Sequence, residues 1–117
     1  MTDQSPQARA VDSADLGPAR AIRRALADRG FKARDVGFVS VWATGQRARE
    51  RAERAVERGL GRFAAGVRTS FDDPDVAGQC AAAIARGEAR VAVALTIDPV
   101  AGDVARAFGR PRAEAGL

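Results

Sequence analysis

The sequence has no histidine, no tyrosine, one cysteine and one lysine among its 117 residues. Cys80 has no second thiol with which to form an internal disulfide, and without histidine the chain has no Cys/His cluster of the kind that binds zinc. Imidazole is also the side chain that most often exchanges protons near neutral pH. We therefore expect no disulfide, no metal site and a narrow range of acid–base chemistry.

Long hydrophobic runs are absent as well. The longest, near 91–95, falls far short of the roughly 20 apolar residues that a membrane helix requires, and the polar first residues contain no apolar signal core. The sequence has no GxGxxG motif, no phosphate-binding loop and no Ser/His/Asp arrangement. We expect a cytoplasmic protein with no membrane association and no cofactor.

The positive charges are almost all arginine. Nineteen Lys and Arg against 15 Asp and Glu give a net charge of only +4, although the isoelectric point is about 10.8. The high isoelectric point reflects the very high pKa of arginine as much as an excess of positive charge. The arginines alternate with Glu50, Glu53 and Glu57, and no tyrosine is present to stack on bases, so we do not expect nucleic-acid binding.

The hydrophobic pattern predicts one α/β domain over residues 14–117. Residues 1–13 are polar and show no periodicity, which indicates a flexible N-terminal tail. Helix and strand patterns then alternate, and the strands are apolar on both faces, which is typical of a small, mostly parallel sheet flanked by helices. The expected helices lie near 18–30, 46–58, 74–87 and 102–108, and the expected strands lie near 36–43, 66–70 and 91–97.

Proline, glycine and aspartate mark the ends of the predicted helices. Pro18 suits the first turn of the first helix, and Gly59 and Gly61 are expected to stop the second. Asp73 is expected to cap the third helix, with Pro74 at its first position and Gly87 at its end. The carboxylates in 72–75 lack the spacing and the glycine of a calcium loop, so helix capping is the favoured interpretation.

Residues 21–46, AIRRALADRGFKARDVGFVSVWATGQ, resemble the C-terminal half of β-ketoacyl synthases and of their chain-length-factor partners, which belong to the thiolase superfamily. In that family a helix of the type AIRxAL, a glycine turn and a DVDxV strand lead into AHGTGT. Laid over this motif without a gap, Trp42 takes the place of the histidine and Thr44 follows it. Gly45 matches the second glycine, and Glu53 falls on the glutamate of the next helix. The resemblance implies a layered half-thiolase-like domain.

A second registration places the chain on the other half of the same fold. The run VAGQCAAAIARGEARVAVALTID, residues 76–98, resembles the N-terminal half of thiolases and of ketosynthases of the initiating type. In those enzymes a nucleophilic cysteine opens the helix, and counting back along the helix puts Ser70 at that position. The small, glycine-rich elbow around the nucleophile is missing. The choice between the two halves stays open.

The resemblance implies a protein that keeps the fold of this family without its catalytic residues. Condensation in this family needs a thiolate nucleophile, histidines that manage decarboxylation, and donors that stabilise an oxyanion. Trp42 offers one N–H donor and a large apolar surface, and it cannot shuttle protons. The leading hypothesis is a non-catalytic pseudoenzyme, an accessory or partner protein in polyketide or fatty-acid biosynthesis.

A lone half of the fold should leave an apolar face and sheet edges unprotected, so we expect a homo-oligomer or a heteromer with a ketosynthase-like chain. An acidic partner such as an acyl carrier protein is a further possibility, because one helix carries a row of arginines. An ordinary solvated helix face is the alternative interpretation of this row. The candidate partner-binding residues are Arg47, Arg51, Arg54 and Arg58.

The main alternative is an acyltransferase of the β-ketoacyl synthase type, in which Cys80 or Ser70 acts with help from a partner subunit. Cys80 lies on the apolar stripe of its predicted helix, where a thiol is poorly ionised and packs as a small hydrophobe. A vestigial product without a role and a basic nucleic-acid binder are the remaining alternatives.

Overall fold

The computed structural model describes the backbone of residues 4–98, 100 and 102–109, and side chains from residue 17 onward. It is an α/β domain with a four-stranded mixed sheet in the order β2-β1-β3-β4. The strands are β1 (Val36–Ala43), β2 (Arg68–Ser70), β3 (Val91–Asp98) and β4 (Gly102–Gly109). β1 is parallel to both β2 and β3, and β4 is antiparallel to β3. The predicted α/β class and the mostly parallel sheet are therefore confirmed.

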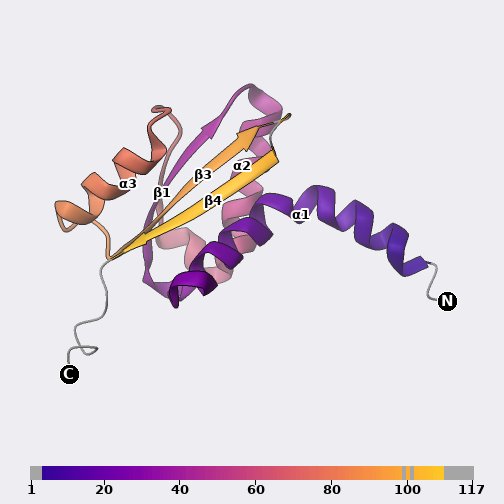
Figure 1. The fold of residues 1–117 in the computed structure, drawn as a ribbon, viewed down its shortest axis with the longest axis horizontal. Helices are drawn as coiled ribbons and strands as arrows, with labels where there is room; N and C mark the ends of the chain where they lie inside the picture. The colour runs from indigo at the N-terminus through magenta and orange to yellow at the C-terminus, as the bar shows by residue number, and fades with distance from the viewer. Residues whose placement is uncertain (1–3, 99, 101, 110–117) are drawn as a thin grey trace.

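Helices cover both faces of the sheet (Figure 1). They are α1 (Gln4–Arg29), α2 (Gln46–Leu60) and α3 (Val76–Ala85), and short 3-10 helices span Ala33–Asp35 and Gly61–Gly66. α1 and α2 pack together on one face, and α3 covers the other. The domain thus has three layers with a separate core on each side of the sheet.

The two cores differ in side-chain size because β3 presents different residues to each face. Val93 and Leu95 belong to the large core beneath α1 and α2, whereas Ala92 and Ala94 belong to the small core beneath α3. Alternating faces are the normal geometry of a strand. Small residues on the α3 side let this helix lie close to the sheet.

The predicted short helix near 102–108 is wrong, because these residues form β4. Alanine and arginine favour helices, but the segment also alternates, with Val104 and Phe108 on one face and Ala105 and Ala107 on the other. Pairing with β3 across a short turn decides the conformation. Tertiary contact therefore overrides local preference here.

The helix boundaries also differ from those expected. α1 begins at Gln4, so Pro18 lies inside the helix and not in its first turn. Residues 1–3 of the expected tail lie outside the described residues, and residues 4–13 continue the α1 backbone away from the sheet (Figure 1). α3 is capped by Asp75, whose side chain accepts a hydrogen bond from the backbone N–H of Gly78 at 3.1 Å, and not by Asp73.

Gly59 does not stop α2 but lies within it, at the contact with α1. A methyl group at this position would lie 3.2 Å from the Cβ and Cγ2 atoms of Ile22 and 3.4 Å from the carbonyl oxygen of Ala19. The absence of a side chain therefore allows the two helices to approach closely. The helix itself ends at Leu60, and the other predicted stop residue, Gly61, follows it as the C-cap with a φ of 62°.

Replacing Gly59 with leucine should lower the free energy of unfolding by about 2 kcal/mol, because the added side chain overpacks the contact with Ile22. Glu57→Leu is the matched control, since Glu57 is an exposed residue of the same helix. Urea denaturation should find the control within about 0.5 kcal/mol of the original protein. Equal effects of the two substitutions would contradict close packing at Gly59.

Candidate functional site

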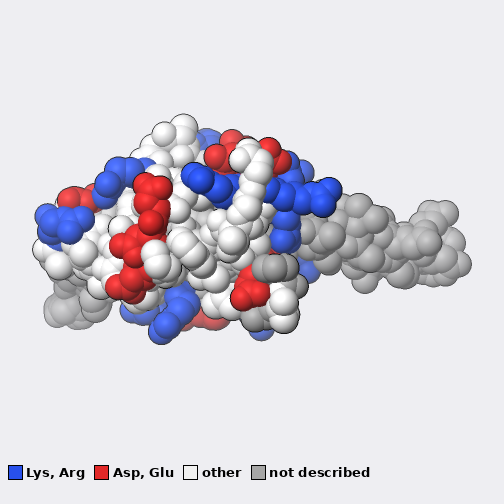
Figure 2. Space-filling view, turned by 90° about the horizontal axis from the view of Figure 1, so that it is seen from above, with Lys and Arg blue, Asp and Glu red and all other residues white. Residues whose placement is uncertain are grey.

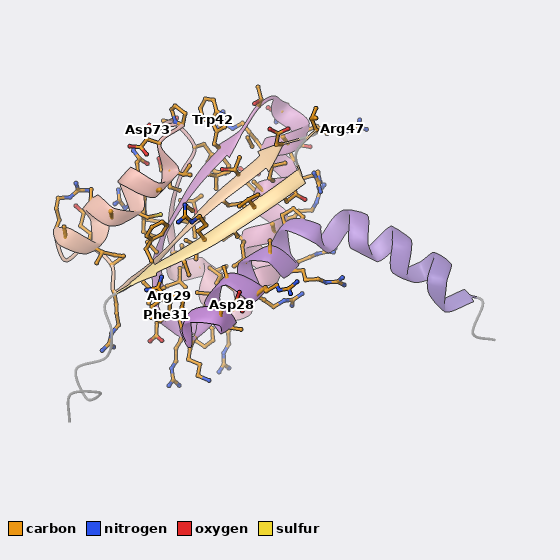
Figure 3. The ribbon with its side chains drawn as sticks, in the orientation of Figure 1. Asp28, Arg29, Phe31, Trp42, Arg47 and Asp73 are labelled. Atoms are coloured by element: carbon orange, nitrogen blue, oxygen red, sulfur yellow. The ribbon has the colours of Figure 1, made fainter. Side chains whose placement is uncertain are left out.

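The carboxyl ends of β1, β2 and β3 meet at one edge of the sheet, because these strands are parallel. Functional sites in open α/β sheets commonly lie outside such an edge. The structure brings Trp42 and Ser70 to this edge, together with the loop that carries Thr44 and Gly45. Figure 3 shows Trp42 and Asp73 at this same end of the domain.

Trp42 is the penultimate residue of β1, which lies between β2 and β3. Its neighbours in register are Thr96 on β3 and, one strand further, Val104 on β4. Trp42 and Val104 are 38% and 51% exposed, which is high for large apolar side chains. We call Trp42, Thr96 and Val104 the tryptophan row. Strand residues two apart point to the same face, so Trp42 shares the face of Ser40 and Thr96 shares the face of Ala94. Ser40 and Ala94 face α3, and the tryptophan row therefore lies on the α3 face of the sheet.

The other residues of the matched motif lie around the start of α2. Gly45 precedes the helix with a φ of 93°, a backbone conformation that favours glycine, and its carbonyl oxygen accepts a hydrogen bond from the N–H of Arg49. Thr44 is exposed. Glu53 lies on the exposed side of α2, about two turns from Gly45. Glu53 is thus separated along the helix from the strand end that carries Trp42.

The four arginines predicted to bind a partner do not share one environment. Arg51 is half-buried, and its Nη2 atom lies 3.3 Å from Oδ2 of Asp103, so that this pair joins α2 to β4. The other three, Arg47, Arg54 and Arg58, are exposed. Arg51 therefore has a structural contact within the domain, whereas its three companions face outward.

A chain of hydrogen bonds connects β1 to the loop before α3. The buried Ser40 hydroxyl donates to Oε1 of Gln79 at 3.1 Å, and Nε2 of Gln79 donates to Oδ2 of Asp73 at 3.3 Å. Asp73 also accepts the backbone N–H of Asp75 at 2.8 Å. We did not predict this network. The sequence signal for it is Ser40, a polar residue in the otherwise apolar β1, together with Gln79, a polar residue in the otherwise apolar α3.

Cys80 is fully buried in the small core, beside Phe38, Ala83 and Ala92. Burial raises the pKa of its thiol to about 11, and a backbone hydrogen bond involving Ser40 opposes this effect only in part. A thiol with such a pKa holds almost no nucleophilic thiolate at neutral pH. The position is that of a packing residue.

Ser70 ends β2 and is half-buried beside a small cavity of about 130 Å³. Arg68, at the other end of β2, contributes to the cavity and lies over the ring of Phe38, 4.7 Å from its centroid. Its guanidinium pairs with Glu88 at 2.6 Å, and Glu88 also accepts a 2.7 Å bond from Arg86, which lowers the pKa of the Glu88 carboxyl. The hydrogen bonds described for this part of the chain give Ser70 no basic side chain to activate its hydroxyl.

Charged side chains border this end of the domain unevenly. In Figure 2, which views the domain from above, a band of acidic side chains lies on the α3 side of a largely uncharged area, and basic side chains lie on its other side together with further acidic ones. Among the described residues there is no group of three or more His, Cys, Asp and Glu side chains that could hold a metal ion. None of the described helices is both long enough and apolar enough to cross a membrane.

Comparison of the chain with protein-family models, with curated proteins and with solved structures gives no match.

The raised pKa of Cys80 predicts slow chemical labelling. At pH 8 only about one thiol in a thousand is ionised when its pKa is about 11, so a thiol-reactive disulfide should label the native protein at least about a hundredfold more slowly than the urea-unfolded protein. Labelling at equal rates in both states would contradict the burial of this thiol.

The same pKa predicts a pH dependence of stability. The folded state favours the neutral thiol, so its stabilising contribution is complete below the unfolded pKa near 9.0 and is lost as the pH rises through about 11. The thermal midpoint of the original protein should fall between these pH values. Cys80→Ala serves as the control, and its midpoint should fall less over the same range.

Proposed function

We propose that the protein is a non-catalytic, ketosynthase-like accessory protein of the thiolase fold, which acts in polyketide or fatty-acid biosynthesis by binding a ketosynthase-like chain. The observation that carries this proposal is the position of Trp42. The residue that stands in the histidine slot of the matched motif lies at the carboxyl end of an inner strand, with its indole partly exposed. An indole there can form a contact and donate one hydrogen bond, but it cannot accept a proton.

The state of the two candidate nucleophiles supports a role without catalysis. Cys80 is buried with a raised pKa, and the chain contains no histidine that could activate Ser70. An acyltransferase mechanism would require both a thiolate or alkoxide and a proton acceptor near the reacting carbon. Among the described residues, Cys80 holds almost no thiolate at neutral pH, and no hydrogen bond to a basic side chain is described for Ser70.

The outer surface of α3 supports a role in protein binding. Gln79 is the only polar side chain in this helix, whose sequence is VAGQCAAAIA, and Gln79 is turned inward to Ser40. The outward positions include the exposed Ala81 and Ala85. Helices at a free surface usually carry charged residues on their outer side, and large exposed apolar areas mark interaction sites. The α3 surface and the neighbouring tryptophan row together form the face on which we place the partner.

The test is co-expression with the β-ketoacyl synthase encoded nearest to this gene, followed by light scattering on a sizing column. We expect a heteromer, or a homodimer when the synthase is omitted. Trp42→Ala should weaken association about tenfold or more, because a central tryptophan commonly contributes that much to an interface. Phe63→Ala is the matched control, since Phe63 has the same exposure of 38% and lies in the 3-10 helix after α2.

Two results would count against the proposal. One is a stable monomer that does not associate with the synthase at micromolar concentrations. The other is an equal loss of association in the Trp42→Ala and Phe63→Ala proteins, which would place the contact elsewhere or indicate non-specific adhesion. Condensation activity of the isolated chain with acyl substrates would overturn the non-catalytic role itself.

A further inference from the structure

The outer edge of β4 presents backbone groups that pair with no described strand. β4 ends the sheet, and β3 occupies only its inner side. Nη1 of Arg29 donates a 3.0 Å hydrogen bond to the carbonyl oxygen of Ala107, which shows that the backbone groups of Ala107 point outward. The N–H and the carbonyl group of one strand residue point toward the same edge of the strand, and successive residues of an antiparallel strand point toward opposite edges. The outward-facing residues are therefore Asp103, Ala105 and Ala107.

Arg29 covers only one end of this edge. Its guanidinium satisfies the carbonyl of Ala107, whereas the N–H and carbonyl groups at Asp103 and Ala105 face outward without a described backbone partner. Exposed strand edges of this kind are templates for the addition of another strand. The available stretch is short, so backbone pairing alone would give weak binding.

A groove between β4 and α1 follows the open edge. One cavity of about 390 Å³ lies between Asp103–Ala105 and the α1 segment 17–28, and a second of about 220 Å³ continues it to Ala107. On the α1 side the groove is lined by Gly17, Ala21 and Ala25. These residues have no side chain or only a methyl group, which leaves the groove open beside β4. Figure 3 shows Asp28 and Arg29 on α1 at one end of this groove, beside β4.

The charges around the groove favour a negative ligand. Asp103, one of the two carboxylates that line it, is already paired with Arg51. The exposed residues Arg20 and Arg24 lie one helical turn apart on α1, so both guanidinium groups can reach a chain lying along the edge. The lining arginines are Arg20, Arg24 and Arg29, and the lining carboxylates are Asp28 and Asp103, whereas the guanidinium of the fourth lining arginine, Arg106, lies over the ring of Phe108 on the α3 face.

We propose that the outer edge of β4 and the arginines of α1 bind an extended acidic segment of another protein, which adds to the sheet as a fifth strand. Hydrogen bonds to Asp103 and Ala105 would align the segment, and Arg20 and Arg24 would pair with its carboxylates. A second copy of this chain is disfavoured as the occupant, because it would bring its own arginines beside these. The inference depends only on the β4 edge and holds whether or not the partner is a ketosynthase.

The probe is a fluorescein-labelled eight-residue peptide in which glutamate alternates with valine, measured by fluorescence anisotropy against the full chain. We expect saturable binding that weakens with added salt. The same peptide N-methylated at alternate residues should bind roughly tenfold more weakly, because it cannot donate hydrogen bonds to one side. A lysine–valine peptide of the same length should show no saturable binding.

Charge reversal on the protein provides the matched comparison. Arg20→Glu/Arg24→Glu should weaken binding of the acidic peptide at least about tenfold. Arg54→Glu/Arg58→Glu makes the same charge change on exposed positions of α2 outside the groove and should leave the affinity within about twofold after allowance for net charge. Hydrogen exchange should also show slower exchange of the Asp103 and Ala105 amides when the peptide is bound.

Equal binding of the N-methylated and unmethylated peptides, or equal loss in the two double variants, would overturn the proposal. So would protection of the Asp103 and Ala105 amides that increases with protein concentration in the absence of peptide, since a second copy would then occupy the edge. Trp42→Ala should leave peptide binding unchanged. This proposal and the proposed function therefore fail on different measurements.

Discussion

The parallel pairing of β1 with β3 is the contact on which the rest of the domain depends. It runs from Val36 and Val91 to Ala43 and Ile97, and it buries both strands between helices. On β3, large side chains on one face and alanines on the other match the two helices α1 and α2 to one side and α3 to the other. The same pairing brings the end of β1, with Trp42, beside Thr96 and makes it a partly exposed site, not a core position.

The chemistry of the domain follows from this burial. The thiol of Cys80 is enclosed in the small core, and the hydroxyl of Ser70 has no described hydrogen bond to a basic side chain. Two accessible surfaces of the domain differ in character. The α3 surface with the tryptophan row is apolar, whereas the groove along β4 is polar and rich in arginine, so the two would select partners by different forces.

The sequence predicts the elements whose pattern is strong in a short window. The β-branched residues of β1 and β3 and the apolar stripe of α2 are of this kind, and the position of Trp42 near the end of β1 follows from them. Elements that depend on distant contacts could not be predicted in the same way. β4 contains helix-favouring residues and becomes a strand by pairing with β3. The Ser40–Gln79 bond and the Arg51–Asp103 pair require knowledge of which helix position faces which strand.

The hairpin of β3 and β4 has a consequence for how the chain folds. β3 ends at Asp98 and β4 begins at Gly102, so these two strands are close in sequence. β1 pairs with β2 and β3, which are both much farther from it along the chain. Closing long loops costs more entropy and slows assembly. During synthesis α1 and β1 leave the ribosome first, and α2 and β2 follow before β3 does. The β3–β4 pair is therefore the part of the sheet whose closure costs the least chain entropy.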